Sequence, residues 1–258
     1  MQRSNKPLVV FITGASSGLG AALARHYGKQ GAILGLTGRR ADALENTASG
    51  LSAHCFIADV RNAQAMQEAA LSFIDAAGTP DIVIACAGIS VGTLTEEKED
   101  LAVFQAVMDA NVMGLVHTFH PFIASMKTKG TGVLCGIASV AGVRGLPGGG
   151  AYSASKAAAR VYLESLRLEL KSSGISVVSV LPGYVSTPMT QVNPYPMPFK
   201  LSAEKAAQKI VRLIEKRKPE RVIPWQMAIV ATLLRCMPRP IYDRLFEKAP
   251  RKPRNLPT

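Results

Sequence analysis

The amino-acid sequence predicts an α/β protein whose doubly wound, parallel, seven-stranded sheet has helices on both faces. Short apolar runs alternate with longer stretches of helical periodicity, which is the order expected of strands joined by crossover helices. The apolar runs are continuous rather than alternating, which is typical of strands that are covered on both faces. With 258 residues the chain is long enough to bury one substantial core.

Seven strands are expected, at Leu8–Thr13, Ala32–Thr37, His54–Ala58, Asp81–Ala85, Val133–Ile137, Ile175–Leu181 and Arg221–Ile223. Helical patterns cover residues 18–29, 41–49, 62–77, 98–125, 152–172 and 202–217. The segment from Thr187 to Lys200 contains four prolines, so we expect neither a helix nor a central strand there. A last apolar helix is predicted between Pro224 and Pro238.

No internal boundary, repeat or low-complexity segment divides the chain. We expect residues 1–221 to form one nucleotide-binding and catalytic domain, with a substrate lid at about 187–200. Residues 222–258 form a basic, apolar C-terminal extension that is not an independent domain. Between Lys200 and Thr258 there are 15 basic and 5 acidic residues, which hold most of the net charge of +12. This uneven distribution argues against a uniformly basic nucleic-acid binder.

The composition is that of a globular protein of a reducing compartment. Hydrophobic residues make up 48% and charged residues 19% of the chain. No apolar run reaches the roughly 18–20 residues that span a bilayer, and no signal-peptide pattern is visible. The four cysteines lack metal-ligand spacing, which predicts no metal site. Three of them lie in apolar, strand-like stretches, which predicts buried free thiols and a cytoplasmic location.

A glycine-rich turn follows the first strand and opens the first helix. Gly14, Gly18 and Gly20 permit a tight turn and the close approach of a pyrophosphate to the amides of a helix N-terminus. The residues between them that share this environment are Ser16, Ser17 and Leu19. In this strand–turn–helix context the pattern predicts a Rossmann fold that binds a dinucleotide.

Arg39 and Arg40 follow the second strand, where NAD-binding sites usually place an acidic residue. Arg39 can pair with a 2′-phosphate and Arg40 can stack on adenine, so NADP(H) is favoured over NAD(H). A solvated pair of arginines at a helix start is the alternative, but cations are disfavoured at that end.

Residues after the third and fourth strands complete the predicted cofactor site. Asp59, followed by Val60, is placed to accept a hydrogen bond from the adenine amino group. Its alternative role, compatible with the first, is to cap the helix that begins near Asn62. Ala87 and Gly88 are small enough to let the cofactor ribose approach the backbone.

Tyr152 and Lys156 lie four residues apart on a predicted helix and so share one face. A fixed cation beside a phenol is expected to lower the phenol's pKa toward neutrality, which would make Tyr152 a usable proton donor and acceptor. Alone, this spacing also fits a solvated helix face. Among the six tyrosines only Tyr152 has a lysine at this position.

Taken together, the chain resembles the short-chain dehydrogenase/reductase family. The matching pieces, in the order and spacing of that family, are Thr13–Gly20, Ala87-Gly88, Asn111, Ser139, Tyr152-x-x-x-Lys156 and Pro182–Thr187. One position departs from the family, because Cys86 stands where Asn-Ala-Gly is usual. In the family this asparagine mainly tethers the backbone of a neighbouring strand. Its replacement by Cys86 is therefore expected to affect local stability more than the catalytic reaction.

The resemblance implies a role for each site residue. Tyr152 is the proton donor in reduction, and Lys156 lowers its pKa and holds the nicotinamide ribose. Ser139 polarises the substrate carbonyl, and Asn111 holds a water that links Lys156 to solvent. The residues that would contact the nicotinamide end of the cofactor are Pro182, Gly183, Val185 and Thr187. The resemblance also implies a homodimer or homotetramer.

The expected substrate wall is largely apolar, with Arg144 as its one charged side chain. Besides Ser139 the substrate residues are expected to be Val140, Arg144, Leu146, Met189 and Tyr195. Such a wall favours a hydrophobic ketone or alcohol, such as a lipid, sphingoid-base, steroid or aromatic compound. Arg144 leaves an anionic head group open.

The C-terminal helix between Trp225 and Met237 leaves three alternatives open. It packs on its own fold or a partner subunit, docks on an anionic membrane surface, or covers the substrate entrance. The membrane alternative would make the protein peripheral at the inner membrane surface.

The sequence thus predicts an NADPH-dependent carbonyl reductase or alcohol dehydrogenase. A non-catalytic NADP(H)-binding regulator or scaffold on the same fold is the alternative. The complete set of Ser139, Tyr152 and Lys156 favours the enzyme.

Overall fold

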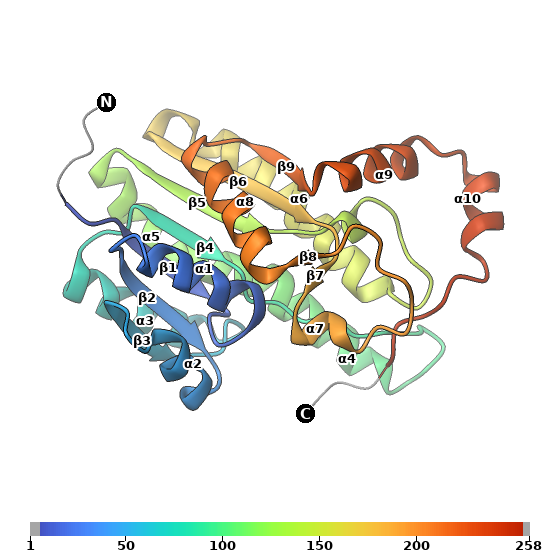
Figure 1. Ribbon diagram of the computed structural model, residues 1–258, viewed down its shortest axis with the longest axis horizontal. Helices are drawn as coiled ribbons and strands as arrows, with labels where there is room; N and C mark the ends of the chain where they lie inside the picture. Colours follow the sequence, from blue (N-terminus) through green and yellow to red (C-terminus); the bar gives the residue numbers. More distant parts are fainter. Residues whose placement is uncertain (1–5, 255–258) are drawn as a thin grey trace.

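A computed structural model of the protein describes residues 6–254 and confirms the predicted fold. One seven-stranded sheet, with every strand pair parallel, has the order β3-β2-β1-β4-β5-β6-β9 (Figure 1). Its strands are β1 (Val9–Thr13), β2 (Ile33–Gly38), β3 (Ala53–Ile57), β4 (Ile82–Ala85), β5 (Gly132–Ile137), β6 (Ile175–Pro182) and β9 (Glu220–Ile223). The order reverses between β1 and β4, where open α/β sheets bind their ligands.

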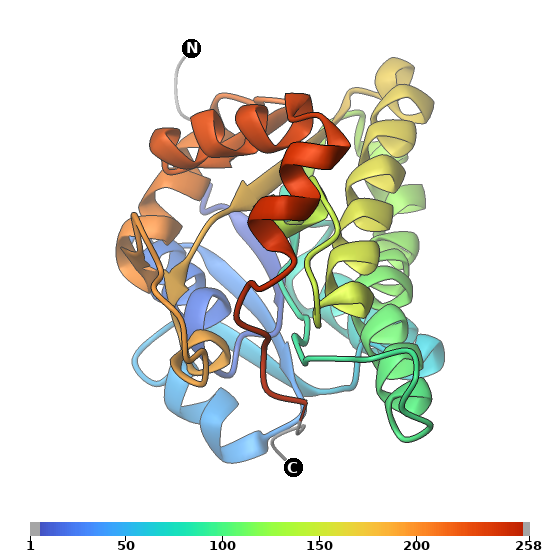
Figure 2. The ribbon, with the colours of Figure 1, turned by 90° about the vertical axis from the view of Figure 1, so that its right-hand side faces the viewer.

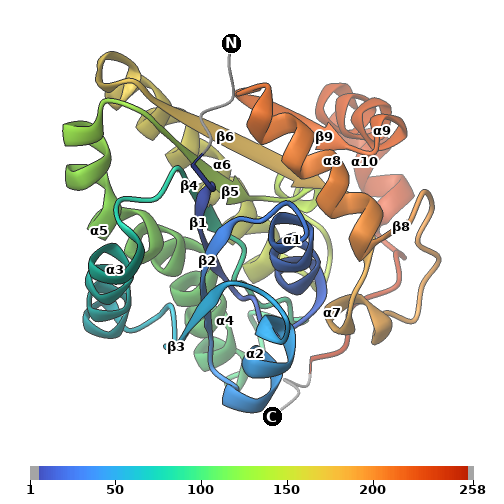
Figure 3. The same ribbon diagram turned by 60° about the vertical axis from the view of Figure 1, so that its left-hand side comes forward.

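Helices cover both faces of the sheet, as Figure 3 shows. One face carries α1 (Gly18–Gly28), α2 (Ala41–Ala48) and α8 (Ala203–Glu215). The other carries α3 (Ala63–Ala77), α5 (Gly114–Lys129) and α6 (Gly150–Glu169), which a short turn at Lys171–Ser173 follows. Alternate residues of β1 face the two layers, since Val10 and Ile12 contact the first and Phe11 the second. The apolar runs in the sequence are continuous because both sides of each central strand are covered by helices.

The helix predicted at 98–125 is a composite of three parts. It consists of α4 (Asp100–Met108), a π-helical turn η1 (Asp109–Met113) and α5. By length and average composition alone, the stretch Asp100–Lys129 is apolar and long enough to span a membrane, although polar residues interrupt it throughout. It serves as a core helix, however, because Phe119, Phe122 and Met126 are fully buried against the sheet.

The proline-rich segment contains a helix that the sequence analysis did not expect. α7 (Pro188–Gln191) begins with Pro188 at its first position, where the missing amide proton costs nothing. Thr187 and Thr190 form a capping box in front of it. Two short parallel strands, β7 (Val185–Ser186) and β8 (Leu201–Ser202), join the base of the segment. The predicted lid is therefore a loop closed at its base.

Two helices follow the sheet in the C-terminal extension. α9 (Trp225–Cys236) is the predicted one and packs through Met227 and Ala231 against Val140. α10 (Arg239–Phe246) was not expected. The chain after α10 returns toward the middle of the molecule, between the lid and the loops after β4 and β5 (Figure 2). The boundary drawn after residue 221 falls inside β9, so the extension begins at Pro224.

Candidate active site

The predicted catalytic side chains converge beyond the carboxyl ends of β4 and β5. Ser139 directly follows β5 and caps a short helical turn, Val140–Gly142, by accepting a hydrogen bond from the Ala141 amide at 3.1 Å. Tyr152 and Lys156 lie in the first turns of α6, whose start packs against that turn. Elements far apart in the sequence are thus brought to one edge of the sheet.

Lys156 is buried, with 6% of its surface exposed. Its Nζ donates a hydrogen bond of 2.8 Å to the Ile137 carbonyl at the end of β5. The same nitrogen lies 5.8 Å from the centre of the Tyr152 ring. Burial lowers the pKa of Lys156 to about 8, so the site contains an ammonium that can release its proton near neutral pH.

The pKa of Tyr152 differs from the sequence expectation. Burial raises this pKa, because desolvation disfavours the phenolate, while a hydrogen bond with Ser139 acts in the opposite direction. Lys156 does not lower it as predicted, since its ammonium is directed at the Ile137 carbonyl and lies 5.8 Å from the centre of the Tyr152 ring. The phenol therefore keeps its proton at neutral pH, which suits a proton donor in reduction.

Asn111 lies in the π-helical turn and is 2% exposed. Its side-chain amide donates to the Ile89 carbonyl and to Ser155 Oγ, both at 2.9 Å, and its Oδ1 accepts from the Ile89 amide at 2.9 Å. The extra residue of a π turn re-aims a side chain, and such turns are frequent at functional sites. Asn111 thereby fixes the loop after β4 against α6.

Gly88 leaves the space in which these side chains meet. A Cβ at this position would lie 2.8 Å from Asn111 Oδ1 and 3.5 Å from Lys156 Nζ. Any larger residue would therefore push the two groups apart. The neighbouring Cys86 replaces the family's asparagine, and here Thr13 Oγ1 ties the strands together by accepting from the amides of Cys86 and Ala87.

Cys86 is a structural thiol. Burial raises its pKa to about 12, so it stays protonated and unreactive at neutral pH. Of the three cysteines in strand-like stretches, Cys135 is completely buried and Cys55 and Cys86 are half-buried, whereas Cys236 is exposed.

The glycine turn leaves no room for a side chain at two of its positions. Gly14 has a φ of +69°, and a Cβ there would lie 2.7 Å from the Ala87 Cα. A Cβ at Gly20 would collide with the Gly14 carbonyl. The N-terminus of α1 has no side-chain cap and no acidic residue in its first turn, so its amides remain available to an anion. Ser16, Ser17 and Leu19 line this turn and are half-buried.

The adenine end of the predicted site combines exposed and paired charges. Arg39 and Arg40 are exposed after β2, and neither is in an ion pair within residues 6–254. Asp59 is paired with Arg61, at 2.6 Å between Oδ2 and the guanidinium, which holds the pKa of Asp59 below its usual range. Asn62, not Asp59, caps α3 by accepting from the Ala65 amide.

The residues expected near the nicotinamide surround the end of β6. Pro182 ends that strand, the Gly183 amide donates to the Ile223 carbonyl at 2.8 Å, and Val185 is buried. A Cβ at Gly18 would lie 3.1 Å from the Thr187 side chain, so this segment borders the glycine turn. Val60, predicted at the adenine end, is buried against Gly114.

The residues predicted for the substrate have different surroundings. The pKa of Tyr195 is raised to about 12, mainly by burial. Electrostatic interactions with the nearby Tyr184 and Tyr152 raise it further. Met189 is partly exposed and Leu146 is half-buried. Val140 is buried under α9.

Arg144 is engaged by the C-terminal helices. Its guanidinium donates to the carbonyls of Leu234 and Met237 at 3.0 Å and lies 4.2 Å above the centre of the Tyr242 ring. These contacts make Arg144 an anchor for α9 and α10 and leave its predicted contact with substrate without support.

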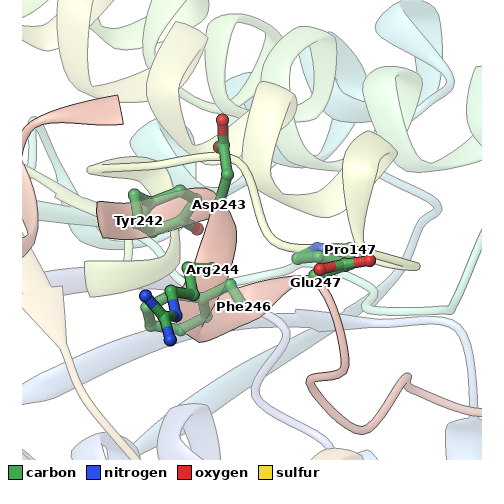
Figure 4. Close-up of a pocket in the computed structure, with 6 residues that line it drawn as sticks. All are labelled: Pro147, Tyr242, Asp243, Arg244, Phe246 and Glu247. Carbon is green, nitrogen blue, oxygen red and sulfur yellow. The ribbon is translucent and has the colours of Figure 1, made fainter. Parts of the chain in front are cut away.

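A surface pocket of about 450 Å³ lies beside α10 (Figure 4), and Tyr152 is not among the residues that line it. It is lined by Pro147, Tyr242, Asp243, Arg244, Phe246 and Glu247. The rings of Tyr242 and Phe246 stack there with centroids 4.4 Å apart. The pocket belongs to the seam where the extension packs and contains none of the catalytic residues.

Sequence reasoning missed Lys252. Its Nζ donates to Ser90 Oγ at 2.8 Å and lies 6.0 Å from the centre of the Tyr152 ring. The substrate side of the site therefore has a second cation that comes from the far end of the chain. Its position depends on the fold of the whole extension, and no local pattern in the sequence indicates it.

Comparisons with known proteins agree with this geometry. The family model described as short chain dehydrogenase matches residues 8–195. An uncharacterized oxidoreductase of Myxococcus xanthus is 34% identical over 237 residues, covering 90% of this chain and 93% of the relative. Sulfoacetaldehyde reductase 2 of Chromohalobacter salexigens is 34% identical over 189 residues, covering 71% and 75%.

A solved structure adds the cofactor to this picture. The short chain dehydrogenase from Burkholderia cenocepacia in complex with NADP is 26% identical and superposes with a TM-score of 0.82, covering 93% of this chain and 98% of that one. The glycine turn, the Tyr152–Lys156 pair and these matches show that the chain belongs to the short-chain dehydrogenase/reductase family, whose members are oxidoreductases that use a nicotinamide cofactor.

Proposed function

We propose that the protein is an NADPH-dependent carbonyl reductase that acts on a ketone or aldehyde with an apolar body, such as a lipid, sphingoid-base or steroid carbonyl. The observation that carries the proposal is the convergence of Ser139, Tyr152 and Lys156 beside the glycine turn. A scaffold that only binds the cofactor would have no use for a desolvated lysine facing a buried phenol.

The division of labour follows from the site. NADPH, when bound, supplies the hydride that reaches the carbonyl carbon. The Tyr152 hydroxyl gives its proton to the carbonyl oxygen, and Ser139 donates a hydrogen bond to that oxygen. Lys156 stabilises the phenolate that remains until a proton from solvent restores it. The name of the Chromohalobacter relative, a reductase of an aldehyde, supports this direction of reaction.

Arg39 supports NADPH over NADH. It is exposed at the end of β2, lies near enough to Asp59 to lower the pKa of that carboxyl, and is in no ion pair among residues 6–254. A guanidinium in this position can pair with the 2′-phosphate through two parallel hydrogen bonds.

The proposal is tested by measuring the oxidation of NADPH and of NADH with a panel of sphingoid, steroid, acyl and aromatic ketones. Wild type should turn over with NADPH on at least one member. Arg39→Asp should shift the ratio of kcat/KM for NADPH over NADH by about 100-fold or more toward NADH, because a carboxylate repels the phosphate. The matched control Arg40→Asp should weaken both cofactors to similar extents.

Two results would count against the proposal. Tight NADPH binding without turnover on any carbonyl compound would favour the scaffold. An unchanged cofactor ratio in Arg39→Asp would show that Arg39 does not contact the 2′-phosphate.

We propose further that the outer surface of the extension docks on an anionic membrane. Trp225, Ile229 and Leu233 are 66%, 52% and 61% exposed, and their spacing of four residues places them on one side of α9. On the following helix α10, Ile241 and Leu245 are likewise exposed, by 52% and 62%. We call these five residues the apolar outer face. Its exposed basic neighbours are Arg221, Arg235, Arg239, Arg244 and Lys248.

The occupant is inferred from charge and from the opposite helix face. Met227 and Ala231 already fill the contact of α9 with the protein itself, so packing on its own fold leaves the apolar outer face unexplained. An apolar helix side flanked by cations fits the boundary of an anionic lipid layer.

Trp225 is the single tryptophan, so its fluorescence reports docking directly. We expect a blue shift and co-sedimentation with vesicles of phosphatidylserine and phosphatidylcholine, weakened by salt, and neither with pure phosphatidylcholine. Ile229→Ser with Leu233→Ser should abolish both signals, whereas Leu71→Ser, an equally exposed control on α3, should preserve them. Equal binding by the double variant, or a rise in molar mass with concentration that these two serines remove, would instead indicate a protein partner.

A further inference from the structure

The segment after α10 forms an arm, residues 247–254, that crosses the substrate side of the active site (Figure 2). The arm is anchored at its far end. Arg254 Nε donates to Asp100 Oδ2 at 2.8 Å, and another guanidinium nitrogen lies 3.1 Å from Glu97 Oε1. Asp100 is 5% exposed, so this ion pair is partly withdrawn from water and its geometry is well defined.

The surface beneath the arm is shaped to receive it. The Gly92 amide donates to the Pro253 carbonyl at 2.9 Å, and a Cβ at Gly92 would collide with the Lys252 carbonyl. A Cβ at Gly148 would lie 2.8 Å from the Arg251 side chain. Each of these glycines therefore allows a contact that a larger residue would block. Residues on both sides of Lys252 are held, which fixes the direction of its side chain.

Lys252 extends from the arm toward Tyr152. Its Nζ donates to Ser90 Oγ at 2.8 Å and approaches the Met189 carbonyl at 3.5 Å. Both partners are neutral, and no carboxylate of residues 6–254 lies within ion-pair distance of this ammonium. Burial lowers the pKa of Lys252 to about 8, which reflects a cation that is desolvated without compensation.

A half-buried ammonium without a counter-ion is costly for the folded protein. The cost would be offset if a ligand brought the missing negative charge. The acidic residue nearest to Lys252 in sequence is Glu247 at the start of the arm, but its carboxylate is exposed beside α10 and makes no ion pair with Lys252. No carboxylate of residues 6–254 supplies this charge, which leaves the ammonium open to an anionic molecule that enters beside Tyr152.

We propose that Lys252 binds an anionic group of the carbonyl substrate, so that the enzyme reduces oxo compounds that carry a carboxylate, sulfonate or phosphate a few bonds from the carbonyl. This inference rests on the proposed reductase function and refines its substrate class. The separation of 6.0 Å between Nζ and the Tyr152 ring sets the short spacing between the two substrate groups. The apolar side chains of Met189 and Tyr195 then contact the remaining body.

The test compares matched pairs of compounds that differ in charge. The pairs are acetoacetate with its ethyl ester, sulfoacetaldehyde with propanal, and glyceraldehyde phosphate with glyceraldehyde, and they separate the three anion types. Lys252→Met should lower kcat/KM for the preferred anionic compound by about 100-fold, mainly through KM. The neutral partner should change by no more than about twofold. Lys252→Arg should retain most of the preference.

Lys248→Met is the matched control, because Lys248 is an exposed cation on the same arm. It removes the same unit of charge and should leave both compounds unaffected. Circular dichroism and melting temperature show whether the arm variants remain folded.

Binding is measured separately from turnover. The dissociation constants of the same pairs are determined with the NADP-loaded Tyr152→Phe variant, with and without Lys252→Met. An anion preference that disappears with Lys252 supports the proposal even if the turnover assay fails. Equal losses for the anionic and neutral compounds, or the absence of any anion preference in wild type, would overturn it and leave the reductase function untouched.

Discussion

Tyr152→Phe is expected to reduce carbonyl turnover by about 10³-fold or more while NADPH still binds, because a positioned general acid contributes about 10²–10⁴-fold to such reactions. The substitution removes one oxygen and leaves the ring in its packing. The lost hydroxyl is the group whose hydrogen bond with Ser139 acts on the pKa of Tyr152. Turnover is measured as NADPH oxidation, and binding as quenching of tryptophan fluorescence or by calorimetry.

Tyr195→Phe is the matched control. Tyr195 lies near Tyr152, and its pKa is also raised, to about 12, chiefly by burial. It is expected to keep its activity, since no Ser139 or Lys156 accompanies its hydroxyl among the contacts of residues 6–254. Substantial turnover in Tyr152→Phe, or its loss in Tyr195→Phe instead, would remove Tyr152 from the role of proton donor.

The sheet was predictable because each strand is specified locally. The continuous apolar runs that become β1, β2 and β4 to β6 are buried between two helical layers, and this burial leaves little choice of residue type. The glycine turn was predictable for the same reason, since the space around Gly14 and Gly20 admits no side chain. At such positions the local structure restricts the residue type, so the sequence alone reveals the structure.

Other features depend on contacts that no local pattern encodes. The π turn holds Asn111, whose side chain bonds to Ile89 and Ser155 from two other parts of the chain. Lowering of the pKa of Tyr152 by Lys156 was expected from spacing alone, but burial raises this pKa and the Lys156 ammonium is directed at the Ile137 carbonyl instead. The spacing of two residues in the sequence indicates whether their side chains can meet. It does not indicate how far both side chains are buried from water, and that burial decides their pKa values.

The C-terminal arm is the largest gap between sequence and structure. Arg254 pairs with Asp100 across 154 positions, and Lys252 reaches Ser90 across 162. The sequence around them is rich in proline and charge, which reads as a solvated tail. Gly92 and Gly148 are the only hints of the arm that we find in the sequence, because a side chain at either position would collide with it. Their role can be recognised only once the position of the arm is known.

Lys156→Met should lower turnover by at least about 10²-fold, because the proton donor loses its neighbouring cation. Its effect on stability has a distinctive dependence on pH. A pKa lowered from 10.5 to about 8 means that keeping the buried ammonium charged costs the folded protein on the order of 3 kcal/mol below pH 8. Methionine removes that cost but leaves the buried Ile137 carbonyl without its donor, which costs about 1–3 kcal/mol.

The two costs nearly cancel at pH 7, so the variant should unfold at about the same urea concentration as wild type. Between about pH 8 and 10.5 the unfolded wild-type chain holds a proton on residue 156 that the folded chain has released. Wild-type stability therefore gains from this group as pH rises through that window, and methionine cannot follow. Above it the variant should be less stable by about 1–3 kcal/mol, the cost of the carbonyl alone. Urea unfolding at several pH values measures this difference, with Lys205→Met on the exposed side of α8 as the control. A stability difference that stays constant across the window would show that Lys156 is not desolvated in the folded protein, and the account of how the site holds its proton would fail with it.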